Sequence, residues 1–557
     1  MTPWWQEAVL YQIYPRSFAD SDGDGMGDLP GITSRLDYVR DLGVDGIWVS
    51  PFYLSPMNDA GYDVADYRRV DPVFGSTADA DALLRRAHEL GLKVLVDLVP
   101  NHTSSEHAWF QAALAAGPGS PERARYHFRD GQGRGGAQPP NRWRSVFGGP
   151  GWTRVVEPDG TPGQWYLHLF DVTQPDLNWE HPQVRAEFLD ILRYWLDRGV
   201  DGFRVDVAHA LVKAPGLPDY DDAPAAPLTA AGDERPPTHL APMWDQDGVH
   251  EIYRSWRALL DSYGEPARIL CAEAWVHPVE RAMLYVRPDE MHQSFAFDFL
   301  DTPWRAADLR EVIAHDRRAL ASVGAAPTWV LSNHDVVRTA SRLGLPAGSP
   351  RPNGLGPRSS VRPDPGLGLR RARAAATLML ALPGAAYLYQ GEELGLPDHP
   401  ELPDEVRQDP VWVRTEHREL GRDGCRVPLP WVGDAPSLGF GPSERTWLPQ
   451  PPEYAALAVD QQVGRPGSTL ELYRRLLTLR REHGVGSAAL TELTGYGDEV
   501  IAYRLDGRSG ALAVVVNLGA SGVELPGGST LLVASDPLVA GRLPTDTAAW
   551  LLLAEAP

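Results

Sequence analysis

The stretch Val94-Leu95-Val96-Asp97-Leu98-Val99-Pro100-Asn101-His102 decides the fold, because it joins an apolar run to a polar end. The aliphatic and β-branched residues at its start favour a buried strand. Burying Asp97 inside such a run is costly unless its carboxylate is paired or hydrogen-bonded. The stretch therefore predicts a central strand whose last residues carry chemistry.

Short β-like runs recur along the chain, and stretches with helical periodicity follow them. The eight runs are residues 8–14, 46–50, 93–99, 202–207, 269–274, 293–299, 328–331 and 385–389. Helical stretches are clearest at 79–90, 185–198 and 369–381, where Gly or Pro follows each end. Eight repeated βα units predict an α/β fold, a closed (β/α)8 TIM barrel.

The segments that connect the predicted strands differ in length, and the long ones indicate further domains. Residues 103–172 are too long for a loop and predict an inserted subdomain after strand three. From 485 onward, short alternating runs predict a C-terminal all-β domain. The expected domains are 1–102 (barrel, first part), 103–172 (inserted B subdomain), 173–484 (barrel, second part) and 485–557. Two Pro-rich insertions remain: 214–243 is expected either to cover the barrel mouth or to be partly mobile, and 344–368 is a candidate lid.

Composition narrows the class of protein. The 557 residues are 43% hydrophobic and 23% charged, with a net charge of −22. This balance argues against nucleic acid or an anionic membrane as a partner. Two cysteines make no disulfide framework, no secretory signal is evident, and no apolar run is long enough to span a membrane. A cytoplasmic protein is expected, with its oligomeric state left open.

Polar residues end several of the predicted strands. Arg204 and Asp206 are two residues apart, so they share one face of their strand, and the cation favours an ionised carboxylate. Glu273 stands alone among small and apolar residues, where desolvation raises the pKa of an acid. Asn333-His334-Asp335 ends the seventh run. In a barrel these ends meet at one face, which predicts a shared active site.

Segments 97–102, 202–209, Glu273 and 333–335 resemble the four signature regions of the α-amylase superfamily, glycoside hydrolase family 13. Residues 11–18, 174–179 and 389–395 resemble its α-glucosidase and oligo-1,6-glucosidase branch. The resemblance runs from about Trp4 to the mid-400s. It implies a retaining mechanism with Asp206 as nucleophile, Glu273 as acid/base and Asp335 as transition-state stabiliser. The two carboxyls of a retaining pair are expected about 5–5.5 Å apart.

The resemblance also implies supporting and substrate-binding residues. Arg204 supports the nucleophile, His102 and His334 donate to sugar hydroxyls, and Asp97 orients the site from behind. In the stretch 56–63, Asp59 and Tyr62 match the positions that hold the terminal non-reducing glucose. An arginine paired with Asp59 would block longer chains and make the enzyme exo-acting. We favour Arg422 as that partner, with Arg426 as the second choice.

The loop at 20–28 has acidic residues at every second position, which suits a hard cation bound through oxygens. It resembles the start of an EF-hand loop, although the Glu expected at the end of such a loop is absent. In the branch that this chain resembles, the same loop binds a structural Ca²⁺. The ligands implied are Asp20, Asp22, Asp24, Asp28 and the carbonyl of Met26.

Together these features predict a retaining exo-acting α-glucosidase that hydrolyses terminal α-linked glucose in disaccharides and short oligosaccharides. No organic cofactor is expected. Val207, directly after the nucleophile, leans towards α-1,6 linkages, while the variant residues around it leave α-1,4 open. The alternative is a transglycosylase or isomerase of the trehalose or isomaltulose synthase type, which uses the same three carboxyls. A non-enzymatic role, as in transporter heavy chains sharing this barrel, is disfavoured because the catalytic set is intact.

Overall fold

The computed structural model describes residues 2–220, 237–349 and 351–554. Its centre is an eight-stranded parallel sheet, in the order β11-β10-β9-β5-β2-β1-β13-β12. A parallel bridge between Phe295, just after β11, and Thr328 of β12 joins the two ends of this order. The sheet therefore closes into a barrel, which confirms the predicted fold class. The barrel strands are β1 (Val9–Ile13), β2 (Gly46–Val49), β5 (Lys93–Leu98), β9 (Gly202–Val205), β10 (Ile269–Ala272), β11 (Gln293–Ser294), β12 (Thr328–Val330) and β13 (Ala385–Tyr389).

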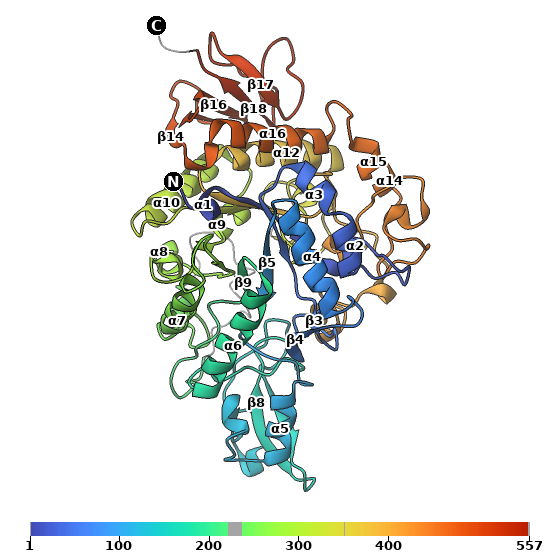
Figure 1. Cartoon of the computed structure of the whole chain (residues 1–557), viewed down its shortest axis with the longest axis vertical. Coiled ribbons are helices and arrows are strands. Elements are labelled where there is room, and N and C mark those ends of the chain that lie inside the picture. The colour runs from blue at the N-terminus through green and yellow to red at the C-terminus, as the bar shows by residue number, and fades with distance from the viewer. Residues whose placement is uncertain (1, 221–236, 350, 555–557) are drawn as a thin grey trace.

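Helices surround the barrel and connect its strands (Figure 1). Around the barrel they are α1 (Trp4–Glu7), α2 (Leu29–Ser34), α3 (Leu36–Leu42), α4 (Thr77–Glu89), α6 (Pro182–Arg198), α7 (Val249–Asp261), α8 (Val279–Ala282), α9 (Phe297–Asp301), α10 (Ala306–Ala321), α11 (Thr339–Arg342) and α12 (Pro365–Ala381). After β13 follow α13 (Pro410–Arg414), α14 (Tyr454–Leu457), α15 (Val459–Gln462) and α16 (Thr469–His483).

Two expected boundaries were wrong. The sixth predicted strand, 293–299, is a strand only at Gln293–Ser294, and its second half is helix α9. A short run with apolar residues does not distinguish a buried strand from a buried helix, and Phe295, Phe297 and Phe299 fit either. Helix α12 begins at Pro365, inside the predicted insertion, because the Asp364 side chain caps the Leu367 N–H and proline suits a first turn.

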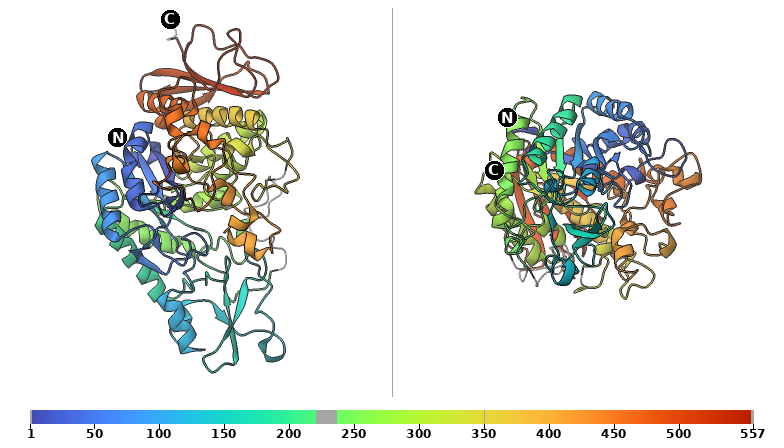
Figure 2. Two further views of the ribbon diagram at one scale, coloured as in Figure 1. Left: turned by 90° about the vertical axis from the view of Figure 1, so that its right-hand side faces the viewer. Right: turned by 90° about the horizontal axis from the view of Figure 1, so that it is seen from below.

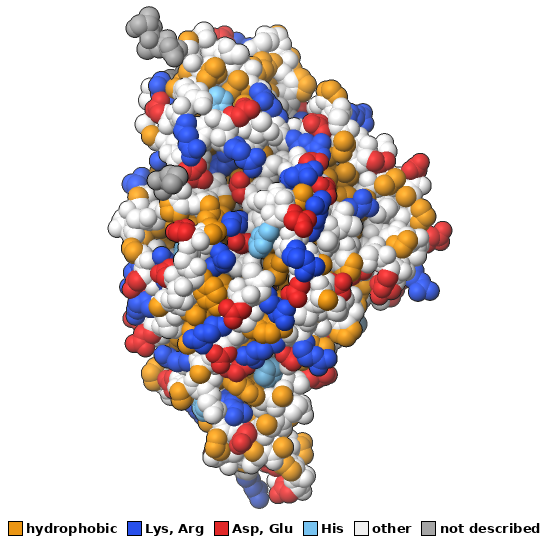
Figure 3. Space-filling model, in the orientation of Figure 1, with side chains coloured by type: hydrophobic (Ala, Val, Ile, Leu, Met, Phe, Trp, Pro, Cys, Tyr) orange, Lys and Arg blue, Asp and Glu red, His pale blue; other side chains and the backbone are white. Residues whose placement is uncertain are grey.

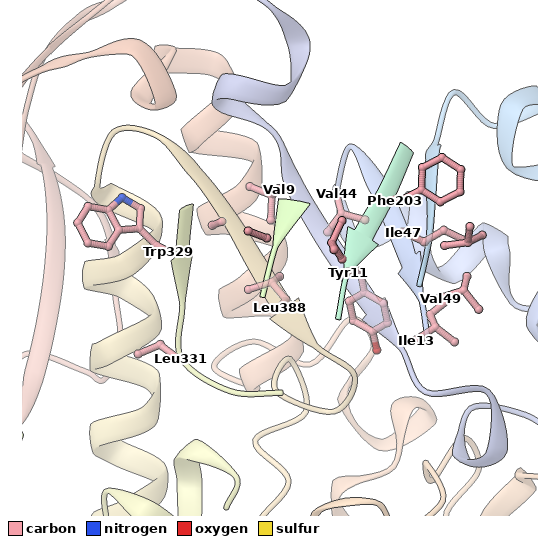
Figure 4. Close-up of a cluster of buried hydrophobic side chains, with 14 of the residues drawn as sticks. Val9, Tyr11, Ile13, Val44, Ile47, Val49, Phe203, Trp329, Leu331 and Leu388 are labelled. Carbon is pink, nitrogen blue, oxygen red and sulfur yellow. The ribbon is translucent and has the colours of Figure 1, made fainter. Parts of the chain in front are cut away.

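Alternation along the barrel strands sorts their side chains into two layers. Val9, Tyr11 and Ile13 belong to the large core between strands and helices, which Figure 4 shows with residues of neighbouring strands. Leu10 between them packs inside the barrel in a separate cluster with Trp48, Leu95, Ile269, Cys271, Val330 and Tyr387. This period of two places every second residue of a strand on the barrel axis.

An inserted subdomain and a C-terminal sheet lie at opposite ends of the molecule (Figures 1 and 2). The first contains α5 (Ala108–Ala116) and the three-stranded antiparallel sheet β6 (Phe128–Arg129), β8 (Pro162–Leu167) and β7 (Trp152–Val156). A small pair, β3 (Tyr53–Leu54) and β4 (Asp66–Val70), precedes it. The C-terminal domain is all β, as predicted, and its sheet is antiparallel, with strands β14 (Ala489–Glu492), β15 (Val500–Gly507), β16 (Gly510–Asn517), β17 (Thr530–Ala534) and β18 (Thr547–Leu552). The exact domain boundaries stay predictions.

The helices and the charged surface bear on the class of protein that composition predicts. Among the described residues, no helix is both long and apolar enough to cross a membrane. Acidic and basic side chains are interspersed over the face shown in Figure 3. Of the insertion predicted at 214–243, residues 221–236 lie outside the part of the chain that is described.

Candidate active site

The inward-facing residues change from apolar to ionisable towards the carboxyl ends of three neighbouring strands. On β5, Leu95 is followed two residues later by Asp97, and Asp97 pairs in register with Arg204 of β9. On β10, Cys271 pairs in register with Arg204, and Glu273 follows two residues later. Strand periodicity and register thus converge these groups at one mouth of the barrel.

Arg204 joins the carboxylates at this mouth. Its Nη1 donates to Asp97 Oδ1 at 2.8 Å and to Asp206 Oδ1 at 2.6 Å. Its Nη2 lies 3.4 Å from Glu273 Oε2. Asp97 also accepts from the Trp48 indole at 3.0 Å and is not among the residues that line the cavity, which fits its expected orienting role. One buried guanidinium therefore contacts three carboxyl groups and offsets part of the cost of burying them together.

The two predicted reacting carboxyls differ in their surroundings. Burial raises the pKa of Asp206 well above its usual range and that of Glu273 to about 7, while Arg204 opposes both shifts. Arg204 lies 2.6 Å from Asp206 and 3.4 Å from Glu273, so its contact with Asp206 is the shorter by 0.8 Å. Because the two groups share one cation and lie close together, a single proton on the pair belongs on Glu273 and the negative charge on Asp206.

Asp335 is held as an anion. Its Oδ1 accepts from Arg422 Nη1 and Arg426 Nη2, both at 2.9 Å. The Nε2 of His334 lies 3.2 Å from its Oδ2. Because Gln12 Nε2 lies 2.7 Å from Nδ1 and can only donate, the proton of this imidazole is on Nε2. Burial acts to raise the pKa of Asp335, but the electrostatic effects of His334, Arg422 and Arg426 outweigh burial and hold this pKa well below its usual range.

Arg422 closes one end of the site. Its Nη2 donates to Asp59 Oδ1 at 2.8 Å, its Nη1 to Asp335, and its Nε to Asp409 Oδ2 at 2.6 Å. Arg426 instead bonds Asp335 and the carbonyl of His334. The structure thus places the first-choice arginine, Arg422, against Asp59. Burial raises the pKa of Asp59 to about 7, and Arg422 opposes that shift.

Tyr62 and His102 lie beside this end of the site. The Tyr62 ring stacks on His334 with centroids 5.2 Å apart and planes at 5°, and its hydroxyl donates to Asp97 at 3.1 Å. Burial lowers the pKa of His102 to about 4, so its imidazole is neutral. Its Nε2 is 3.1 Å from the Tyr62 carbonyl and 3.2 Å from the amide of Gln174, which also donates to Asp59. In this structure His102 therefore braces the loop that carries Asp59.

These residues line a cavity of about 370 Å³, at the low end of the range of roughly 300–1,000 Å³ typical of small-molecule sites. Of the predicted site residues, Asp59, Tyr62, His102, Asp206, Glu273, His334, Asp335 and Arg422 line it, whereas Arg204 lies behind them. Sequence reasoning missed the rest of the wall. It comprises Arg144, Val146, Phe147, Gly148, Phe170, Arg351, Pro352, Asn353, Val411, Thr415 and Glu419. Val207, which was singled out above for linkage preference, also lines the cavity.

Most of the missed residues come from the long insertions, while Val411, Thr415 and Glu419 come from the segment after β13. Phe147 and Phe170 belong to the inserted subdomain, and Arg351 belongs to the insertion at 344–368. No strand-end pattern marks such residues, since loops reach a site through tertiary packing. The signal that was present is the length of the insertions, because long loops in compact domains are commonly functional.

The acidic loop gathers part of its predicted ligand set. Oxygens of Asp20, Asp22 and Asp28 lie within 4.8 Å of one another. Asp24 is outside this group, and its Oδ1 accepts the Met26 N–H at 2.7 Å. The thioether of Met26 contacts the guanidinium of Arg16 at 3.3 Å. The loop is thus organised by its own backbone N–H groups around three converging carboxylates.

Comparison with protein families matches residues 12–488 to the α-amylase catalytic domain and residues 488–550 to a domain of unknown function, DUF3459. The chain is 35% identical to an oligo-1,6-glucosidase of Parageobacillus thermoglucosidasius, over 86% of this chain and 84% of that protein. It is 39% identical to a probable α-glucosidase of Rhizobium meliloti (strain 1021), over 86% and 82%.

Solved structures agree with this assignment. An α-glucosyl transfer enzyme matches with a TM-score of 0.83 and 36% identity over the whole of both chains. A trehalulose synthase matches with a TM-score of 0.84 and 29% identity, over 99% of this chain and 100% of that one. The predicted family and enzyme class are confirmed: the chain belongs to the α-amylase family of glycoside hydrolases.

Proposed function

We propose that this enzyme hydrolyses the terminal non-reducing α-linked glucose of disaccharides and short oligosaccharides, with retention of configuration. The observation that carries the proposal is the ion pair between Arg422 and Asp59, at 2.8 Å, beside the reacting carboxyls. A pocket closed at that end admits one terminal sugar and excludes a continuing chain. The names of the relatives, oligo-1,6-glucosidase and probable α-glucosidase, agree with this activity.

The reaction follows from the charges assigned above. The Asp206 carboxylate attacks the anomeric carbon while Glu273, whose raised pKa of about 7 lets it hold a proton below that pH, gives its proton to the leaving oxygen. Glu273, now a carboxylate, then takes a proton from water as this water displaces Asp206 from the sugar. Asp335 stays anionic throughout and stabilises the oxocarbenium-like transition state. The shared contact with Arg204 supports a close carboxyl pair, as retention needs.

The test is product analysis on maltose, isomaltose, sucrose and trehalose. Free glucose should be the main product, released first as the α-anomer in proton NMR. Initial release of β-glucose would refute retention. Cleavage inside a chromogenic maltoheptaose blocked at its non-reducing end would refute an exo-acting enzyme, because the Asp59–Arg422 pair leaves that end no room.

Linkage preference rests on Val207, which lines the cavity. Its φ of 41° is rare for a β-branched residue, and its N–H donates to Glu273 Oε2 at 2.7 Å. The branched side chain is therefore fixed next to the leaving group, on the acceptor side. This position supports the lean towards α-1,6 linkages, with α-1,4 linkages as the measured comparison.

Glucosyl transfer is the second candidate function. The observation that favours it is the apolar part of the cavity wall, from Phe147, Phe170 and Val411, which limits water near the covalent intermediate. Solved relatives described as an α-glucosyl transfer enzyme and a trehalulose synthase agree with it. A new disaccharide as the main product from sucrose or maltose would decide for transfer.

Structural Ca²⁺ in the loop at 20–28 is a further part of the proposal. Three carboxylates with oxygens within 4.8 Å, two of them buried, supply the hard oxygen donors that this ion prefers. Among the described residues, no lysine or arginine forms an ion pair with them, so their charge calls for a cation. Asp20, Asp22 and Asp28 would hold the ion, with Asp24 and the Met26 carbonyl as further candidates.

The cytosol is the proposed compartment. Cys271 and Cys425 are both buried and unpaired, as suits a reducing environment.

A further inference from the structure

Trp275 lies two residues after Glu273 and is buried. Its indole Nε1 donates to Glu273 Oε1 at 2.8 Å, and the Val207 backbone N–H donates to Oε2 at 2.7 Å. Each oxygen of the proposed acid/base therefore has a fixed donor. One donor is backbone and the other is a side chain that the mechanism above does not use.

The ring of Trp275 is itself held by two groups. Phe297 stacks on it with centroids 3.8 Å apart and planes at 2°. The guanidinium of Arg351 lies over the ring, 4.9 Å from its centroid, and forms an ion pair with Asp301 at 2.5 Å. Phe297 and Asp301 are the first and last residues of α9. This short helix thus fixes the indole directly and also anchors the cation above it.

The contacts have a chemical consequence at Glu273. Burial raises the pKa of this carboxyl to about 7, and the hydrogen bond from Trp275 works in the opposite direction, because it stabilises the anion. A cation over the indole face draws electron density from the ring. The N–H then becomes a better donor, as in other polarised hydrogen-bonded chains.

We propose that Trp275 is a positioning residue that fixes the carboxyl of Glu273 for proton transfer to the leaving oxygen. Arg351, from the insertion at 344–368, strengthens this hold through the indole. The inference rests on the proposed function, since it requires Glu273 to act as the acid.

The test is Trp275→Phe, which keeps a ring against Phe297 and removes the N–H donor. Cleavage of substrates whose leaving group needs a proton should slow the most. We expect kcat/KM on isomaltose and maltose to fall by about ten- to a hundredfold, mostly in kcat. On p-nitrophenyl α-glucoside, whose leaving group departs without a proton, the fall should stay below about threefold. The alkaline limb of the pH profile should move to higher pH, because the variant loses a bond that stabilises the anion.

Arg351→Met tests the second part without changing Trp275. Its effect should have the same direction and be smaller, with isomaltose again more affected than the aryl glucoside. Arg362→Met is the matched control, because Arg362 lies in the same insertion, is half exposed and pairs with Glu401 at 2.7 Å. This control should match the wild type on both substrates.

Two outcomes overturn the inference. One is an equal fall on both substrates in Trp275→Phe with an unchanged pH profile, which indicates a merely structural ring. The other is wild-type kinetics on isomaltose in that variant. A wild-type enzyme that cleaves none of these glucosides refutes the proposed function instead, so the two failures are distinguishable. Melting temperatures of all variants show whether each is folded.

Discussion

Removing the cation that closes the site should reveal strong coupling between Arg422 and Asp59. Arg422 makes three ion pairs, at 2.6, 2.8 and 2.9 Å. In Arg422→Met, Asp335 keeps Arg426 at 2.9 Å, whereas Asp59 keeps the Gln174 amide at 3.1 Å in place of a full charge. The pKa of Asp59 is raised to about 7 even with Arg422 present, so Asp59 becomes a neutral acid at pH 7 in the variant.

The magnitude follows from breaking a buried pair, which costs about 3–5 kcal/mol in the free energy of unfolding. A loss of the same size in transition-state binding lowers kcat/KM by roughly 10²–10⁴-fold. Asp59→Asn alone should cost about 1.5–3 kcal/mol, as for a hydrogen bond to a charged group. In the Arg422→Met background, Asp59→Asn should cost less than about 0.5 kcal/mol, because the carboxyl is then already neutral.

The assay is a double-mutant cycle, measured by urea unfolding and by kcat/KM on p-nitrophenyl α-glucoside at pH 7. Arg414→Met is the control for losing an arginine from the same region, since Arg414 pairs with Asp171 at 3.5 Å and not with Asp59. Its double mutant with Asp59→Asn should be additive. Additivity within about 0.5 kcal/mol in the Arg422 cycle would refute the reasoning.

Three further predictions concern pH, linkage and metal. Glu273 acts protonated and its pKa is raised to about 7, so kcat/KM should fall as pH rises above about 7, and Glu273→Gln should abolish this limb together with most activity on maltose; a Gln variant as active as wild type on maltose contradicts the assignment. Val207→Ala should raise the maltose-to-isomaltose ratio of kcat/KM by about tenfold, since it removes branching next to the leaving group; an unchanged ratio places linkage choice elsewhere. Chelation should lower the melting temperature by roughly 2–8 °C, with recovery on adding Ca²⁺; Asp20→Asn should not respond, and an equal response in that variant counts against the loop.

Local sequence was sufficient for the barrel and for the ionisable residues at its strand ends. Apolar runs of period two and helices of period 3.6 are properties of neighbouring residues, so they can be read without tertiary information. The failure at 293–299 shows the limit. Phe295, Phe297 and Phe299 are equally apolar in a strand or a helix, and only the bridge from Phe295 to Thr328 determines where pairing ends.

The roles of Asp206 and Glu273 were expected from the sequence, yet the site around them depends on contacts between distant segments. Sequence left Arg422 and Arg426 as alternatives, because either could reach Asp59, and the packing of the segment after β13 puts Arg422 there. Trp275 is only two residues from Glu273 in the chain, but the contacts of its ring with Phe297 and Arg351 come from tertiary packing. Local sequence determined which groups could react, and tertiary packing decided their charges and geometry, because desolvation and ion pairing depend on every segment that meets at the barrel mouth.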